Sequence, residues 1–180
     1  MFPRMALGTA IIALMIAVHP AHLEAAQQNI HLVDQRGSQF AFENLRGAPI
    51  VLSFISAHCT DTCPLIDAQI ARTVHRLGSS PLAVRFLTVT LDPERDSAAD
   101  MHRIAHEFEA HSPRWIVASG HTADVHALMR RYGVEISRDS HGYATAHTSF
   151  IYILNPQLRV RRTLLASGDL AEQLFREVSQ

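Results

Sequence analysis

The strongest constraint on the fold is a stretch in which the only two cysteines of the chain, Cys59 and Cys63, join an apolar run to a helical pattern. Residues 49–55 are mostly apolar with almost no alternation, which is typical of a central strand covered on both faces. Pro64 suits the first residue of a helix, where a missing N–H costs nothing. Apolar residues then recur at helical spacing until Gly78: Ile66, Ile70, Val74 and Leu77.

The rest of the chain predicts strands and helices that alternate around that central strand. Strands are expected at 30–33, 39–42, 82–89, 115–118, 148–154 and 158–162. Helices are expected after a cap at Asp96 or Ser97, over 125–132 before Gly133, and over 170–178. Residues 137–142 are polar and are expected to form a turn. This order predicts an α/β, thioredoxin-like fold, with a central mixed β-sheet flanked by helices and an N-terminal β-hairpin.

Residues 1–26 have the pattern of a targeting segment. The apolar run from Met5 to Val18 has about 14 residues, which is short for a membrane span of roughly 20. Leu23-Glu24-Ala25 offers a cleavage site for an export signal. We expect a cleaved signal peptide or, as a second interpretation, an uncleaved anchor to the inner membrane through residues 5–18. A buried N-terminal helix is the least favoured reading, and residues 27–180 are expected to form one periplasmic domain.

Composition gives no indication of nucleic-acid binding. The formal net charge is −1, so a basic footprint is not expected. A hydrophobic content of 47% is ample for one core. The twelve histidines are scattered, which favours solvated surface residues over a metal-binding tract. The chemistry is therefore sought at the cysteine stretch.

The spacing of the two cysteines favours chemistry over a structural disulfide. An exported protein meets an oxidising compartment, where such a bond can form. A loop closed over three intervening residues removes little chain entropy, however, so the bond would add little stability. The field of a helix N-terminus is expected to lower a cysteine pKa there. Two thiolates select Cu(I) or zinc, and an added imidazole would also accept Cu(II).

Five histidines are considered as partners of the two thiols. His147 immediately precedes the strand expected at 148–154, and in a thioredoxin-like architecture the residue entering that strand approaches the cysteine loop. His58 adjoins Cys59 and could tune it electrostatically, but it is poorly placed as a ligand. His102 and His106 could form a zinc pair one helical turn apart, although a solvated surface is the favoured interpretation. His141 lies in a polar turn. His147 is therefore the preferred third ligand.

Three segments of the chain resemble the Sco/SenC family of copper proteins, over about residues 30–178. The most specific is the cysteine stretch, in which Cys59, Asp61, Cys63 and Pro64 match the family pattern. Residues 90–96 resemble its D-P-x-R-D segment. Residues 143–156 resemble the stretch that carries the family's histidine, which falls on His147.

The resemblance implies a thioredoxin-like fold and one copper ion bound by Cys59, Cys63 and His147. Family members help to assemble the copper centre of respiratory cytochrome oxidase, by delivering metal or by reducing the thiols of the acceptor. The implied partners are a copper-accepting oxidase subunit or another copper chaperone, and a thiol reductant. Three residues depart from the family pattern: Ala146 replaces an acid, Thr148 replaces Ser, and Gln157 stands where a Gly-containing turn is common.

Two alternatives remain open from the sequence. Cys59 and Cys63 could be the redox pair of an exported thiol–disulfide oxidoreductase or redox sensor, in which Cys59 attacks first. The protein could instead be a binding module stapled by a structural disulfide. A peroxidase is less favoured than either, because a histidine that enters the facing strand has no part in peroxidase chemistry.

Overall fold

The computed structural model describes residues 29–59, 62–80, 83–111, 113–142, 144–147 and 149–179. The predicted targeting segment, residues 1–26, lies outside this part of the chain. Within the described ranges, no helix combines the length and the apolar character needed to cross a membrane. The interpretations of the N-terminus therefore stay predictions.

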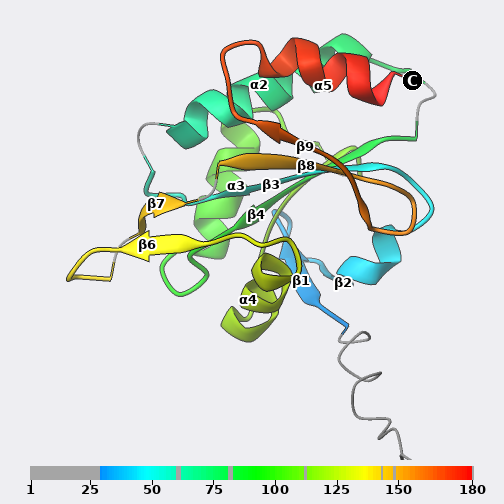
Figure 1. Cartoon of the computed structure of the whole chain (residues 1–180). Helices are drawn as coiled ribbons and strands as arrows, with labels where there is room; N and C mark the ends of the chain where they lie inside the picture. Colours follow the sequence, from blue (N-terminus) through cyan, green and yellow to red (C-terminus); the bar gives the residue numbers. More distant parts are fainter. Residues whose placement is uncertain are drawn as a thin grey trace, which may run out of the picture.

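The described strands form one mixed sheet of seven strands in the order β2-β1-β5-β4-β3-β8-β9 (Figure 1). Three parallel strands make its centre: β3 (Ile50–Ile55), β4 (Arg85–Thr90) and β5 (Trp115–Gly120). An antiparallel hairpin adds to each side. These hairpins are β1 (His31–Asp34) with β2 (Gln39–Ala41), and β8 (Phe150–Leu154) with β9 (Val160–Leu165). The strand that leads to the cysteines is therefore paired on both sides.

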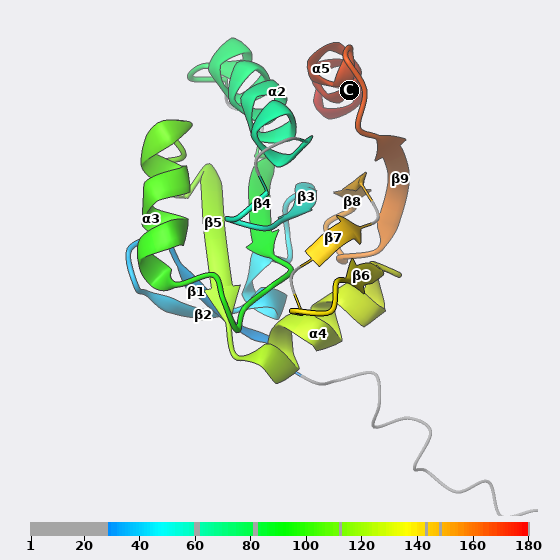
Figure 2. The same cartoon turned by 90° about the vertical axis from the view of Figure 1, so that its left-hand side faces the viewer.

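Helices cover both faces of the sheet (Figure 2). Three helices pack on one face: α2 (Thr62–Leu77), α3 (Ala98–Glu107) and α5 (Leu170–Val178). On the other face lie α4 (Thr122–Arg131) and the short 3-10 helix η1 (Phe42–Leu45). A separate two-stranded ribbon, β6 (Ile136–Arg138) with β7 (Ala144–His147), leads from α4 back toward β8.

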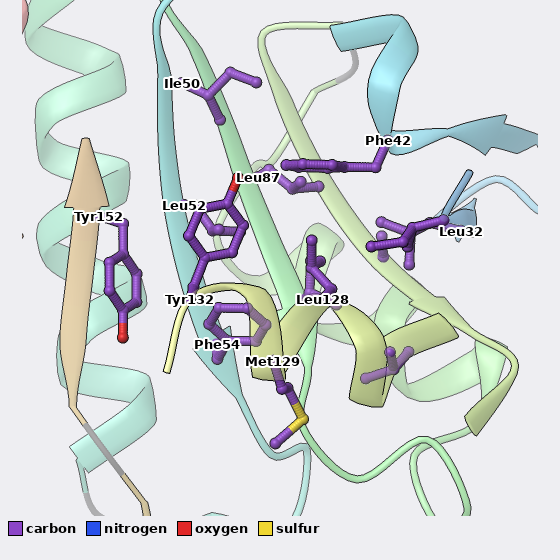
Figure 3. Packing of buried hydrophobic residues seen from close by; sticks show 14 of the residues in the cluster. Leu32, Phe42, Ile50, Leu52, Phe54, Leu87, Leu128, Met129, Tyr132 and Tyr152 are labelled. Carbon is purple, nitrogen blue, oxygen red and sulfur yellow. The ribbon is translucent and has the colours of Figure 1, made fainter. Parts of the chain in front are cut away.

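Alternate residues of the central strands divide between two apolar cores, one on each face. Leu52 and Phe54 of β3 face α4, where Figure 3 shows them near Leu128, Met129 and Tyr132. Val51 and Ile55 face α2 in the other core. All six residues of β3 are buried, as the unbroken apolar run predicted.

Most of the predicted elements are confirmed. Ser97 caps α3 through a reciprocal capping box with Asp100. Gly78 and Gly133 follow α2 and α4 with φ of +50° and +66°, a region that glycine enters without strain.

Several boundaries were wrong; for example, β9 was predicted at 158–162 and covers Val160–Leu165. Helix α2 begins at Thr62, two residues before Pro64, so Pro64 occupies another first-turn position whose N–H needs no helical partner. Strand β4 begins at Arg85, so residues 83–84 of the predicted strand are not part of it, and residue 82 lies outside the described residues. The polar segment 137–142 is also more than a turn, because Ile136–Arg138 pairs with β7. Polar side chains are compatible with a ribbon outside the main sheet. Strand β6 has only three residues, too few for an alternation of apolar and polar residues to indicate a strand.

Candidate metal centre

The cysteine loop leaves the carboxyl end of β3 and is tied to the segment that follows β4. The Cys59 N–H donates to the Ser56 carbonyl at 3.1 Å and closes a tight turn. The Ala57 N–H donates to Asp96 Oδ2 at 3.0 Å. Burial raises the pKa of the Asp96 carboxyl, and the hydrogen bonds that it accepts from Thr90 and Ala57 oppose that rise. The loop that carries Cys59 is therefore fixed by its own turn and by one backbone hydrogen bond to a buried carboxyl.

Cys63 lies in the first turn of α2 and is buried, with 2% of its surface exposed. Its backbone N–H donates to Cys59 Sγ at 3.5 Å, so the two residues are in direct contact. Both cysteines are thiols. Burial raises the pKa of the Cys63 thiol well above its ordinary value, and its hydrogen bond with Cys59 adds to the rise. The predicted lowering by the helix N-terminus is therefore wrong for Cys63, because loss of solvation outweighs the helix field.

His147 ends β7, at the side of the molecule where α2 begins (Figure 1). Its Nε2 lies 3.7 Å from Cys63 Sγ, although the two residues are 84 positions apart. The structure thus places His147 against Cys63, while Cys59 contacts Cys63 from the loop.

The donor set fits one soft metal ion. Bonds of about 2.3 Å to sulfur and 2.1 Å to imidazole, at an angle of about 110–120°, would put the two donor atoms about 3.6–3.8 Å apart. The Cys63–His147 separation of 3.7 Å falls in that range. No group of three or more His, Cys, Asp or Glu side chains in the described residues is already arranged to hold a metal. The structure therefore places two candidate donor atoms at this separation, with Cys59 in contact with Cys63.

The other candidate histidines lie elsewhere. His58 Nε2 is 3.7 Å from Asp96 Oδ1, so it meets a carboxylate. His102 and His106 are exposed on α3, and His102 Nδ1 is 3.3 Å from the Gln35 carbonyl oxygen. His141 is exposed in the loop between β6 and β7. These positions agree with the surface interpretation for His102 and His106.

Sequence reasoning missed a buried carboxyl one helical turn after Cys63. Asp67 is 2% exposed, and its Oδ1 has no hydrogen-bond partner within the described part of the chain. Burial raises the pKa of Asp67 to about 8, and the negative charge of Glu107 adds to the rise. An aspartate at an inward position of α2 was the available signal, since charged residues are rarely buried unpaired.

Asp67→Asn is expected to stabilise the protein at pH 8. Between about pH 4 and pH 8 the folded protein holds a proton on Asp67 that the unfolded chain has lost, so wild-type stability falls as pH rises. Asn removes that dependence. The expected gain at pH 8 is on the order of 1–3 kcal/mol, because Asn stays neutral without a proton, whereas Asp67 must either hold a proton or bury a negative charge. Urea unfolding at pH 5 and pH 8 measures it, and an equal effect at both values would contradict the titration of Asp67.

Comparison with known proteins identifies the family. The SCO1/SenC family model matches residues 19–180. The chain belongs to the SCO1/SenC family. Among its relatives, the mitochondrial SCO2 homolog of Mus musculus is 32% identical over 136 residues, covering 72% of this chain and 52% of the relative. A SCO2-like protein of Rickettsia prowazekii is 26% identical over 129 residues, covering 69% of this chain and 62% of the relative. The chain thus spans about half the length of the mitochondrial relatives that it matches.

Solved structures of other proteins share the fold. A putative electron transfer protein from Aquifex aeolicus superposes with a TM-score of 0.74 at 25% identity, over 84% of this chain and 89% of that one. Arabidopsis thaliana ScoI with copper bound gives a TM-score of 0.71 at 22% identity, over 85% of this chain and 98% of that one. The predictions of the SCO1/SenC family and of a thioredoxin-like fold are therefore confirmed.

Proposed function

We propose that this protein binds one copper ion through Cys59, Cys63 and His147 and serves as a metallochaperone for the copper centre of respiratory cytochrome oxidase. The observation that carries the proposal is the 3.7 Å contact between Cys63 Sγ and His147 Nε2, with Cys59 in contact with Cys63. Membership of the SCO1/SenC family and the copper-bound Arabidopsis structure support it.

The donor types account for both oxidation states of the cargo. Two thiolates hold Cu(I), and the imidazole extends binding to Cu(II). Because burial raises the pKa of the Cys63 thiol, metal must displace a proton from it, so apparent affinity rises with pH. The site also buries one sulfur while leaving Cys59 partly exposed, which gives an acceptor access from one side.

The proposed partners follow from that role. The acceptor is a copper-binding subunit of the oxidase or another copper chaperone, and a thiol reductant keeps the cysteine pair open. The proposed location is the periplasm, with residues 5–18 acting as a signal or as an inner-membrane anchor. The mitochondrial relatives support a role in a respiratory compartment.

Copper titration of the reduced exported domain tests the proposal. Wild type is expected to retain about one copper per chain after desalting, and its Cu(II) form should show an EPR signal with sulfur and nitrogen ligands. His147→Ala should weaken Cu(II) by at least about 100-fold and Cu(I) much less, because the thiolates hold Cu(I). His141→Ala, an exposed histidine in the same ribbon, is the control. Wild type that loses its copper on desalting would refute the proposal.

The second candidate is a thiol–disulfide oxidoreductase. It is favoured by one observation, the hydrogen bond from the Cys63 N–H to Cys59 Sγ, which stabilises a thiolate on the more exposed sulfur. Such an enzyme should exchange disulfides readily. A reduction potential below about −300 mV with negligible exchange would indicate an inert bond instead.

A further inference from the structure

Residues 92–96 follow β4 and lie between the two parts of the candidate metal centre. One part is the cysteine loop, which Asp96 holds through the Ala57 N–H. Asp96 is itself fixed by the hydroxyl of Thr90, the last residue of β4. The Leu91 N–H donates to the Ile55 carbonyl at 2.7 Å, so the ends of β3 and β4 stay in register up to the loop.

The opposite end of the same segment holds the β6–β7 ribbon. Asp92 is 1% exposed, and its Oδ1 lies 3.0 Å from Arg138 Nη1 of β6. The same Arg138 nitrogen donates to the Gly142 carbonyl at 2.9 Å. Arg95 contacts Asp92 at 3.2 Å and donates to the His141 carbonyl at 3.3 Å. Two guanidinium groups therefore tie the loop of the ribbon to one buried carboxylate.

Strand pairing within the ribbon connects these arginine contacts to His147. Ile136 of β6 lies opposite His147 of β7, two residues from Arg138. The ribbon pairs with no strand of the main sheet among the described residues. Apart from its chain connections to α4 and β8, its position next to Cys63 therefore depends on contacts outside the strand pairing, of which the buried Asp92 cluster is the best defined.

We propose that residues 92–96 are a positioning element that sets the distance between the cysteine loop, held by Asp96, and His147, held through Asp92, Arg95 and Arg138. None of these side chains is a proposed ligand. The element fixes the imidazole relative to Cys63 before metal arrives, so that binding does not have to order the ribbon. The consequence for copper rests on the proposed function, whereas the consequence for the ribbon does not.

Arg138→Gln tests the histidine side of the element. Cu(II) affinity is expected to fall about 10-fold. This is the lower end of the range seen when a residue that supports a metal ligand is removed. Cu(I) affinity should stay within about threefold, because both thiolates remain. Arg138→Lys should restore part of the loss, since a single nitrogen of Arg138 makes both contacts.

Arg131→Gln is the matched control. Arg131 Nη1 pairs with Glu43 at 2.9 Å, and its side chain is 29% exposed, against 28% for Arg138. This pair lies in the part of the fold formed by α4 and η1. Arg131→Gln is expected to leave both copper affinities unchanged, and equal losses in the two variants would overturn the proposal.

Amide hydrogen exchange of the metal-free protein separates the proposal from the copper function. Arg138→Gln should speed exchange in β6 and β7 by about 10-fold or more while β3 and β4 keep their protection. Unchanged exchange in the ribbon would overturn the proposal. If the wild-type protein binds no copper, the proposed function is wrong. The exchange rates of the ribbon amides then still test whether residues 92–96 position the ribbon.

Discussion

Cys63→Ser is expected to weaken Cu(I) binding to the reduced protein by at least about 100-fold. This loss exceeds the effect of removing a residue that only hydrogen-bonds to a metal ligand. A hydroxyl is a hard donor and does not replace a thiolate on a soft ion. Cys63 would supply the buried sulfur of the proposed centre, and it contacts both other proposed ligands. Competition with a Cu(I) chelator measures the loss.

The fold of this variant should persist. Ser is close in shape to Cys, and its hydroxyl can form a hydrogen bond with His147 Nε2 in place of the sulfur contact. Far-UV circular dichroism and the thermal midpoint provide that control. Undiminished Cu(I) affinity in a folded Cys63→Ser protein would remove Cys63 from the centre and leave the redox role as the better explanation of the pair.

The path of the chain through the site was predictable because it depends on local patterns. The apolar run at residues 49–55 and the helical spacing after Pro64 required a buried strand followed by a helix. Both exist, as β3 and α2. The nearness of His147 to Cys63 followed from the fold class, because β8 is antiparallel to β3 and so begins near the end at which β3 stops.

Contacts between distant segments could not be predicted from the sequence. Gln35 looked like part of a hairpin turn, yet its buried side chain bonds the carbonyls of Ala110 and Trp115 and the N–H of Val117. The role of Asp92 also depends on an arginine 46 residues away, and no local pattern identifies that partner. The raised pKa of Cys63 has the same origin, since burial is set by tertiary packing.

Ala146 is the departure that bears most on the site. It lies in β7, next to His147, where the family resemblance implies an acid. An acid there would add negative charge near the metal, and its absence is expected to alter affinity or the preferred oxidation state. The arginine contacts of Asp92 supply an anchor for the ribbon that does not depend on residue 146.

Trp115→Ala is expected to destabilise the protein by about 3–5 kcal/mol. Trp115 is fully buried, and its Nε1 donates to Thr88 Oγ1 at 3.0 Å. That hydroxyl also forms a hydrogen bond with Ser53 Oγ at 2.9 Å, so a series of side-chain hydrogen bonds connects β5, β4 and β3. The substitution creates a cavity and removes the hydrogen bond from the Trp115 indole to Thr88. Such a loss is a large share of a typical stability of about 5–15 kcal/mol.

Urea unfolding followed by circular dichroism measures this effect, since Trp115 is the only tryptophan and its fluorescence disappears with it. Phe150→Ala is the control, because Phe150 is 38% exposed and its edge contact with Tyr152 is worth about 1 kcal/mol. Below the unfolding midpoint, Trp115→Ala should still bind copper, because Trp115 is not a proposed ligand. The free energy of unfolding could instead fall no further in Trp115→Ala than in Phe150→Ala. That result would show that these side-chain hydrogen bonds and the core beneath α2 and α3 contribute little to the stability of β3 and of the cysteine loop that follows it.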